Sequence, residues 1–117
     1  MVLETIDTAR LVVDAIAGKM GADILLLDLT AITIIADFFV IATGESERQL
    51  EAMSGEVLRQ LEKNDGATPL AVEGTPESGW LLIDYGSVVV HLFSQMQRAR
   101  YQLEGLWHNA HTIVRIA

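Results

Sequence analysis

Short apolar runs constrain the fold of this chain more than any other feature. Residues 24–29 are apolar except for Asp28, and residues 38–43 form a second run that ends at Gly44. Apolar runs of about six residues are typical of strands buried on both faces, because side chains on either side of the strand then meet a core. The two runs therefore predict central strands of a sheet that is covered on both sides.

Two longer segments predict the helices that would cover this sheet. Residues 4–19 repeat apolar side chains three, four or seven positions apart, and Gly18 and Gly21 bracket the expected end. A second helix should begin after Ser46, which forms a capping-box pattern with Gln49, and residues 64–66 should stop it.

The last third of the chain predicts mostly strands. The candidates are residues 69–73, 80–84 and 88–93, and the tight connection at residues 85–87 makes the last two a hairpin. A helix between strands favours parallel pairing, whereas a hairpin is antiparallel, so both kinds of pairing should occur in one sheet.

The remaining segments complete the predicted order αββαβββα. Residues 30–36 are interpreted as a connection, a short amphipathic helix should run from Ser94 to Trp107, and no element is assigned after that residue. We predict an α/β fold, close to α+β, with one mixed sheet of about five strands and helices packed on it. The 117 residues should form a single domain with a core at 4–107 and a tail at 108–117.

The charge balance argues against direct nucleic-acid binding. The chain has 8 Lys and Arg against 16 Asp and Glu, a net charge of −8, whereas nucleic-acid binders need a basic face. An acidic protein suits a basic partner, although the same charge also keeps a protein soluble. The absence of cysteine, of a targeting segment and of a long apolar run favours a cytoplasmic protein.

The residue sets needed for enzymatic chemistry are incomplete. No Gly-x-Ser-x-Gly motif occurs, and His108 and His111 lack the cysteine or carboxylate pair of a zinc site. Residues 43–46 join a strand to a helix N-terminus, where phosphate can bind. Nucleotidyl transfer also needs two carboxylates on a following strand, and residues 69–73 supply only Glu73. We therefore expect no catalytic residues, no metal and no cofactor.

Three aromatic residues are candidates for partner contacts. Trp80, Tyr85 and Trp107 lie at the ends of predicted elements, where side chains are often only partly buried. Tyrosine and tryptophan are favoured interface anchors, but each of these residues taken alone fits a role in completing the core better.

Four blocks of sequence follow one another in order with compatible spacing. They cover residues 37–49, residues 72–86, the Val-Val-Val-His-Leu-Phe run at residues 88–93 and residues 100–107. Together they resemble the RsfS/Iojap family of ribosomal silencing factors, and the likeness extends from about Ala22 to Trp107. Ser87, Gln95, Met96 and Gly105 depart from the usual family pattern, which affects expected details of affinity.

The resemblance implies a fold like that of nucleotidyltransferases without the metal-binding carboxylates. It also implies a partner, large-subunit ribosomal protein fourteen, on which the protein would block joining of the small subunit and reduce translation when nutrients are short. Family members are expected to be homodimers when free. The positions within the blocks point to partner-binding residues Trp80, Asp84, Tyr85, His91, Arg100 and Glu104.

Two other functions stay open at this point. One is a divergent enzyme with the nucleotidyltransferase fold, which a magnesium-dependent thermal shift with nucleotide would reveal. The other is a dimeric adaptor for a different protein, which a pulldown from a lysate would separate from ribosome binding.

Overall fold

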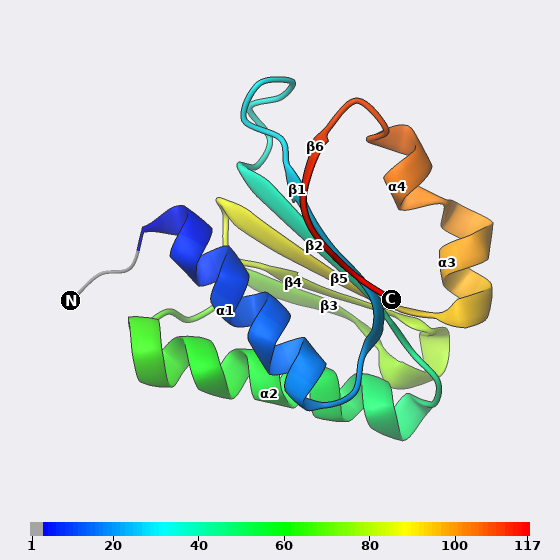
Figure 1. Cartoon of the computed structure of the whole chain (residues 1–117). Coiled ribbons are helices and arrows are strands. Elements are labelled where there is room, and N and C mark those ends of the chain that lie inside the picture. Colours follow the sequence, from blue (N-terminus) through cyan, green and yellow to red (C-terminus); the bar gives the residue numbers. More distant parts are fainter. Residues whose placement is uncertain (1–3) are drawn as a thin grey trace.

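The computed structural model describes residues 4–117 (Figure 1). In chain order its elements are α1 (Thr5–Gly18), β1 (Ala22–Asp28), β2 (Phe38–Gly44), α2 (Glu47–Asp65), β3 (Ala71–Thr75), the 3-10 helix η1 (Pro76–Ser78), β4 (Trp80–Asp84), β5 (Val88–Ser94), α3 (Gln95–Tyr101), α4 (Leu103–Leu106) and β6 (His111–Ile116). The strands form one six-stranded sheet in the order β3-β4-β5-β2-β1-β6.

Parallel and antiparallel pairing coexist in this sheet, as predicted. β2 and β5 run parallel, with Phe38 opposite Val88. β4 and β5 form the predicted antiparallel hairpin, in which Trp80 lies opposite Phe93. The mixed α/β fold class is therefore confirmed.

One face of the sheet is covered by α1 and α2, and we call it the helix face (Figure 1). Its strands contribute aliphatic side chains, and Leu26, Val40 and Ile83 are fully buried there against residues such as Ile16 and Met53 of the helices. Complete burial of one such side chain contributes about 1.5–3 kcal/mol, so this layer supplies much of the stability.

The start of α2 confirms the predicted N-cap at Ser46, whereas the return bond of the predicted capping box goes to Glu45 and not to Ser46. The Ser46 hydroxyl accepts a hydrogen bond from the backbone N–H of Gln49 at 3.1 Å, and the Gln49 side-chain oxygen accepts one from the N–H of Glu45 at 2.6 Å. The Gln49 amide also donates to the carbonyl of Met20 at 2.8 Å, which ties the end of α1 to the start of α2.

The predicted strand count was too low because β6 lies in the segment to which no element was assigned. β6 pairs antiparallel with β1, and Ile24 lies opposite Ile116. It is an edge strand in which only Ile113 and Val114 pack against the buried core, so its sequence lacks the apolar run that marks the central strands.

The third strand was predicted two residues too early. Gly74, which follows the predicted strand at residues 69–73, lies within β3 with a φ of 85°. A Cβ atom at this position would lie 2.0 Å from the carbonyl oxygen of Trp80, so only glycine allows β3 to approach β4 this closely.

The helix predicted between Ser94 and Trp107 is broken in two. Gln102 separates α3 from α4 and adopts a left-handed conformation with a φ of 47°. The apolar side chains of this segment are not buried as one stripe, since Met96 is 76% and Leu106 73% exposed.

Helices α3 and α4 lie on the second face of the sheet and cover only part of it (Figure 1). Leu103 and Trp107 pack there against a second buried cluster. We call this surface the aromatic face, and its rings come from Phe39, Trp80, His91, Phe93 and Tyr101.

Candidate partner-binding surface

Alternation along β4 separates the two faces of the sheet. Leu81 and Ile83 are buried in the helix-face core, whereas Trp80 and Leu82 pack partly buried on the aromatic face. Asp84 follows the same alternation and belongs with Trp80 and Leu82.

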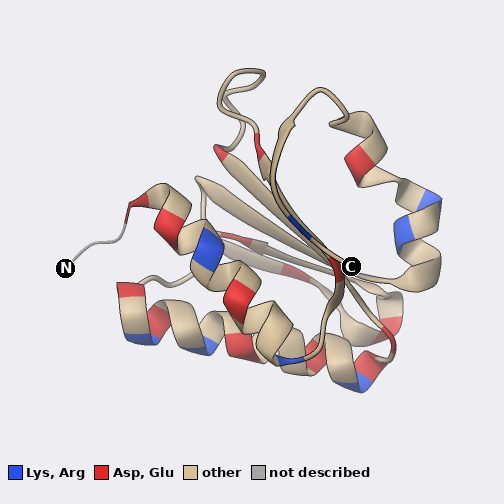
Figure 2. Ribbon diagram, viewed as in Figure 1, with Lys and Arg blue, Asp and Glu red and all other residues tan. Residues whose placement is uncertain are grey.

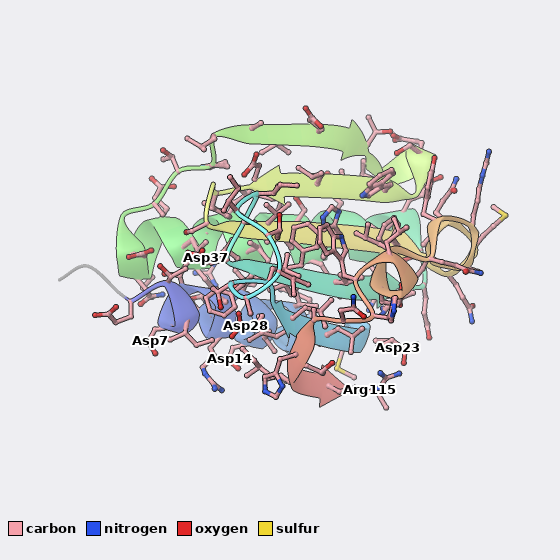
Figure 3. All side chains as sticks on the ribbon, turned by 90° about the horizontal axis from the view of Figure 1, so that it is seen from above. Asp7, Asp14, Asp23, Asp28, Asp37 and Arg115 are labelled. Atoms are coloured by element: carbon pink, nitrogen blue, oxygen red, sulfur yellow. The ribbon has the colours of Figure 1, made fainter. Side chains whose placement is uncertain are left out.

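Figure 3 shows the molecule from above, with Asp28 and Asp37 at the two ends of the loop formed by residues 30–36.

Trp80 and His91 are joined by a hydrogen bond on the aromatic face. The indole Nε1–H donates to His91 Nδ1 at 3.3 Å. Trp80 also stacks on Phe93, with ring centroids 5.2 Å apart, and meets Tyr101 of α3 at 4.6 Å. His91 makes an edge contact with Phe39 at 4.8 Å. The rings therefore brace one another, and the position of Trp80 is determined on three sides.

Burial holds His91 in its neutral form. Desolvation lowers its pKa from 6.5 to about 4, against a smaller opposing effect of the Asp84 charge. Because Nδ1 accepts the indole hydrogen bond, the proton of the neutral ring lies on Nε2. This Nε2 is buried without a hydrogen-bond partner among residues 4–117, so it is a donor that a water or a partner oxygen can satisfy.

Asp84 shapes the turn between β4 and β5. Its Oδ1 accepts a hydrogen bond from the backbone N–H of Gly86 at 2.7 Å. An aspartate that bonds the backbone two residues on is typical of tight turns. The carboxylate is only partly buried, so its second oxygen can meet a basic side chain.

The next residue, Tyr85, turns to the other layer. It packs against the helix-face core, and burial raises the pKa of its phenol to about 12. Its hydroxyl is buried and has no hydrogen-bond partner in the described chain. Trp80 and Tyr85, both candidate interface anchors, thus lie at the start and just past the end of β4 and face different layers.

Glu104 has a cationic partner within the chain. Its Oε2 accepts from Arg98 Nε at 2.7 Å, and Arg98 also donates from Nη1 to the Thr43 hydroxyl at 2.9 Å and to the carbonyl of Asp23. The Arg98 side chain is only 11% exposed. It therefore links α3 and α4 to the ends of two strands.

Arg100 lies on the exposed side of α3. Its guanidinium carbon is 5.8 Å from the ring centroid of Tyr101, a cation–π distance. The predicted residues are thus not one cluster: Trp80, Asp84 and His91 share a face, while Arg100 and Glu104 belong to the helices that border it.

Two residues of this surface were not predicted as partner-binding residues. Tyr101 packs on Trp80 although it is 44% exposed, and Arg98 holds its helix in place. An aromatic residue on an amphipathic segment was a visible signal for Tyr101. The role of Arg98 depends on contacts with residues more than fifty positions away, which no local pattern reveals.

The described residues offer no metal-ligand cluster. Across residues 4–117, His, Asp and Glu side chains do not gather in a group of three or more that could hold a metal ion.

None of the helices in this range is long and apolar enough to cross a membrane. Acidic residues lie on both sides of the sheet (Figure 2).

The family model described as "Ribosomal silencing factor during starvation" matches residues 2–116, almost the whole chain. The chain belongs to the RsfS family. Ribosomal silencing factor RsfS of Halalkalibacterium halodurans is 39% identical over 104 residues, which are 89% of this chain and 88% of that protein.

Two further relatives extend the comparison within and beyond bacteria. A crystal structure of a Chromobacterium violaceum protein is 32% identical with a TM-score of 0.86, covering 91% of this chain and 88% of that one. The mouse protein named "Mitochondrial assembly of ribosomal large subunit protein 1" is 30% identical over 83% of this chain and 43% of its own length. The fold is thus shared with the Chromobacterium violaceum structure, and the names of the other two relatives refer to the ribosome.

Proposed function

We propose that this RsfS-family chain represses translation by occupying the large ribosomal subunit. Its contact would be large-subunit ribosomal protein fourteen, and its presence there would prevent the small subunit from joining. The action would take place in the cytoplasm, when nutrients are limiting.

The observation that carries this proposal is the partly uncovered aromatic face. Trp80 is held in a fixed position by His91 and Phe93 while one part of it stays accessible. Rigid aromatic anchors of this kind dominate binding energy at protein interfaces. A partly exposed carboxylate, Asp84, lies on the same strand and would pair with a basic partner.

The mechanism requires no bond chemistry. The protein and the small subunit compete for one surface, so the fraction of silenced subunits depends on occupancy alone. An interface of about 1,600 Å² in total is enough for a specific complex of this kind. The net charge of −8 favours encounter with a basic ribosomal protein and disfavours contact with RNA.

The six predicted residues divide into contact and support roles. Trp80, Asp84 and Arg100 would touch the partner, since each has accessible atoms. His91 would orient Trp80, Glu104 would orient Arg98, and Tyr85 would hold the hairpin turn.

Light scattering during subunit association tests the proposal. Added protein should lower the initial joined fraction strongly when it is preincubated with large subunits. Preincubation with small subunits should give a smaller initial effect, because the protein must then capture large subunits while the subunits are already joining. Equal inhibition in both orders of addition would contradict the proposed target.

A charge variant tests the surface without disturbing the turn. Asp84→Asn can still accept the Gly86 hydrogen bond but removes the charge. It should weaken cosedimentation with large subunits, whereas Glu51→Gln, an exposed position on α2, should not. Sedimentation velocity of the free protein would show whether it is the homodimer that we also propose.

A further inference from the structure

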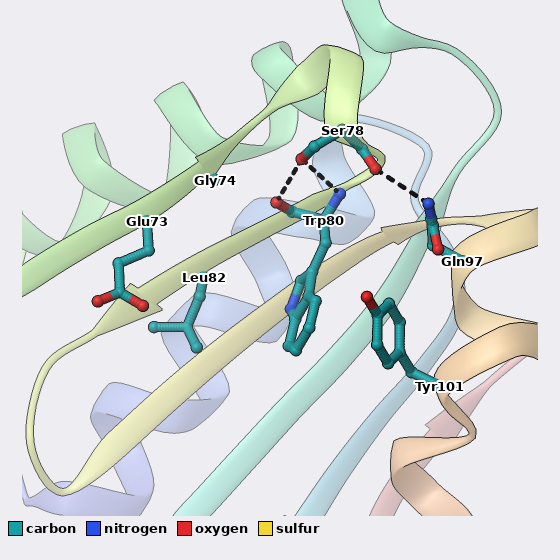
Figure 4. Close-up of a pocket in the computed structure, with 7 residues that line it drawn as sticks. All are labelled: Glu73, Gly74, Ser78, Trp80, Leu82, Gln97 and Tyr101. Atoms are coloured by element: carbon teal, nitrogen blue, oxygen red, sulfur yellow. Dashed lines mark hydrogen bonds between the residues drawn. The ribbon is translucent and has the colours of Figure 1, made fainter.

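A groove of about 300 Å³ crosses the aromatic face beside β4, between β3 and α3 (Figure 4). Glu73 and Leu82 lie on one side of the Trp80 indole, and Gln97 and Tyr101 lie on the other (Figure 4). Since Trp80 stacks on Phe93 of the neighbouring strand β5, its open side is the one towards β3 and the Glu73 carboxylate.

The α3 end of the groove contains an unused acceptor. The Gln97 amide nitrogen donates to the carbonyl of Ser78 at 3.2 Å, which fixes the orientation of the amide. Its oxygen, Oε1, is buried and has no hydrogen-bond partner among the described residues 4–117. A buried acceptor left in this state favours a ligand that brings an N–H donor.

The β3–β4 side of the groove has no positive charge in its sequence, whereas Arg98 and Arg100 lie beside Tyr101 on the α3 side. Residues 64–97 contain four acidic residues and no lysine or arginine. A carboxylate, an aromatic ring face, an apolar side chain and a free amide oxygen therefore meet in one groove. This combination is complementary to a cation with several N–H donors and an apolar stem.

We propose that this groove binds an arginine side chain of the partner protein. The planar guanidinium would lie on the open side of Trp80 and pair with Glu73, while Leu82 would contact the methylene stem. Arginine fits better than lysine because its flat, weakly hydrated head group stacks on rings, as Arg100 does with Tyr101 at 5.8 Å.

The identification of the partner as a ribosomal protein rests on the proposed function, but the chemistry of the groove does not. The test is therefore made first with a small probe, N-acetyl-arginine N-methylamide. In ¹H–¹⁵N spectra of the whole chain, the indole signal of Trp80 and the amides of Gly74 and Leu82 should shift saturably. The citrulline analogue, which is neutral and nearly isosteric, should not cause these shifts.

A matched pair of variants assigns the charge that is responsible. Glu73→Gln should weaken binding of the arginine probe about three- to fivefold, the range expected for one partly exposed ion pair. Glu77→Gln makes the same charge change on η1 outside the groove and should leave the affinity unchanged. Equal shifts with citrulline, or undiminished probe binding by Glu73→Gln, would overturn the proposal.

Large-subunit binding then separates this inference from the proposed function. If the unmodified chain binds large subunits but Glu73→Gln changes neither probe nor subunit binding, the arginine site is wrong and the function stands. If the probe binds in a Glu73-dependent way but large subunits are not bound, the site stands and the ribosomal partner is wrong.

Discussion

The two faces of the sheet use the same strands for different purposes. The helix face buries aliphatic side chains under α1 and α2, and Leu26, Val40 and Ile83 have no exposed surface there. The aromatic face instead presents rings and polar atoms, including the buried but unpartnered His91 Nε2 and Gln97 Oε1. A closed aliphatic layer stabilises the fold. An aromatic layer in which some hydrogen-bonding atoms lack a partner is suited to binding another molecule.

Neighbouring residues of β4 allow the sharpest test of this comparison. Ile83→Ala, in the helix face, should destabilise the protein by about 2–5 kcal/mol because it leaves a cavity in a closed core. Leu82→Ala, one residue earlier on the partly open face, should cost clearly less, while weakening partner binding. Urea denaturation measures both changes, and equal losses of stability would show that the two faces do not differ in this way.

The sequence predicted the helix face better than the aromatic face for a physical reason. Apolar runs and helical spacing are local, and they located α2 and the β4–β5 hairpin correctly. The break at Gln102 and the Arg98 contacts depend on residues distant in sequence. The position of Tyr85 on the helix face also arises from the turn geometry, which its residue type does not determine.

Lowering the pH should destabilise the folded protein through His91, which lies on the aromatic face. The pKa of this residue in the folded protein is about 4, below its ordinary value of 6.5. Between these values the unfolded chain takes up a proton that the folded protein does not, so stability falls as pH falls from 6.5 to 4. The full difference corresponds to on the order of 3 kcal/mol.

Thermal melts across this pH range, with His91→Gln as the comparison, measure the effect. The variant should lose much of the slope, while His108→Gln, an exposed position near the C-terminus, should retain it. Asp28 does not interfere, because hydrogen bonds from Thr30 hold its pKa below 3.8 and its contribution is lost only at lower pH. An unchanged slope in His91→Gln would argue against a buried neutral imidazole.

Removal of Arg98 should detach the helices that border the aromatic face. Arg98→Ala deletes the bonds to Glu104, Thr43 and Asp23, and should cost about 1.5–3 kcal/mol because a partly buried carboxylate is left without its partner. Arg59→Ala is the matched control, since its ion pair with Glu56 on α2 has an arginine that is 59% exposed and should contribute little to stability.

Hydrogen exchange distinguishes local loosening from general destabilisation in this pair. In Arg98→Ala, exchange should rise first in α3 and α4, with the amides of α1 and α2 still protected. A uniform rise through both layers would mean that Arg98 supports the whole fold and not one face.

The smallest effect is expected at Tyr85, on the helix face just past the end of β4. Its hydroxyl is buried without a partner, so Tyr85→Phe should change stability at pH 7 by less than about 1 kcal/mol. The folded pKa of about 12 lies above the ordinary value of 10, so the unfolded chain ionises first and stability is lost as pH rises from 10 to 12. Tyr85→Phe should remove this alkaline loss of stability, and Tyr101→Phe, on the aromatic face, should not.

Because Tyr85 packs on the helix face, the Tyr85→Phe variant should also retain large-subunit binding to within about twofold, well under 1 kcal/mol. A larger loss would place the Tyr85 hydroxyl at the interface and extend the recognition surface around the end of β4.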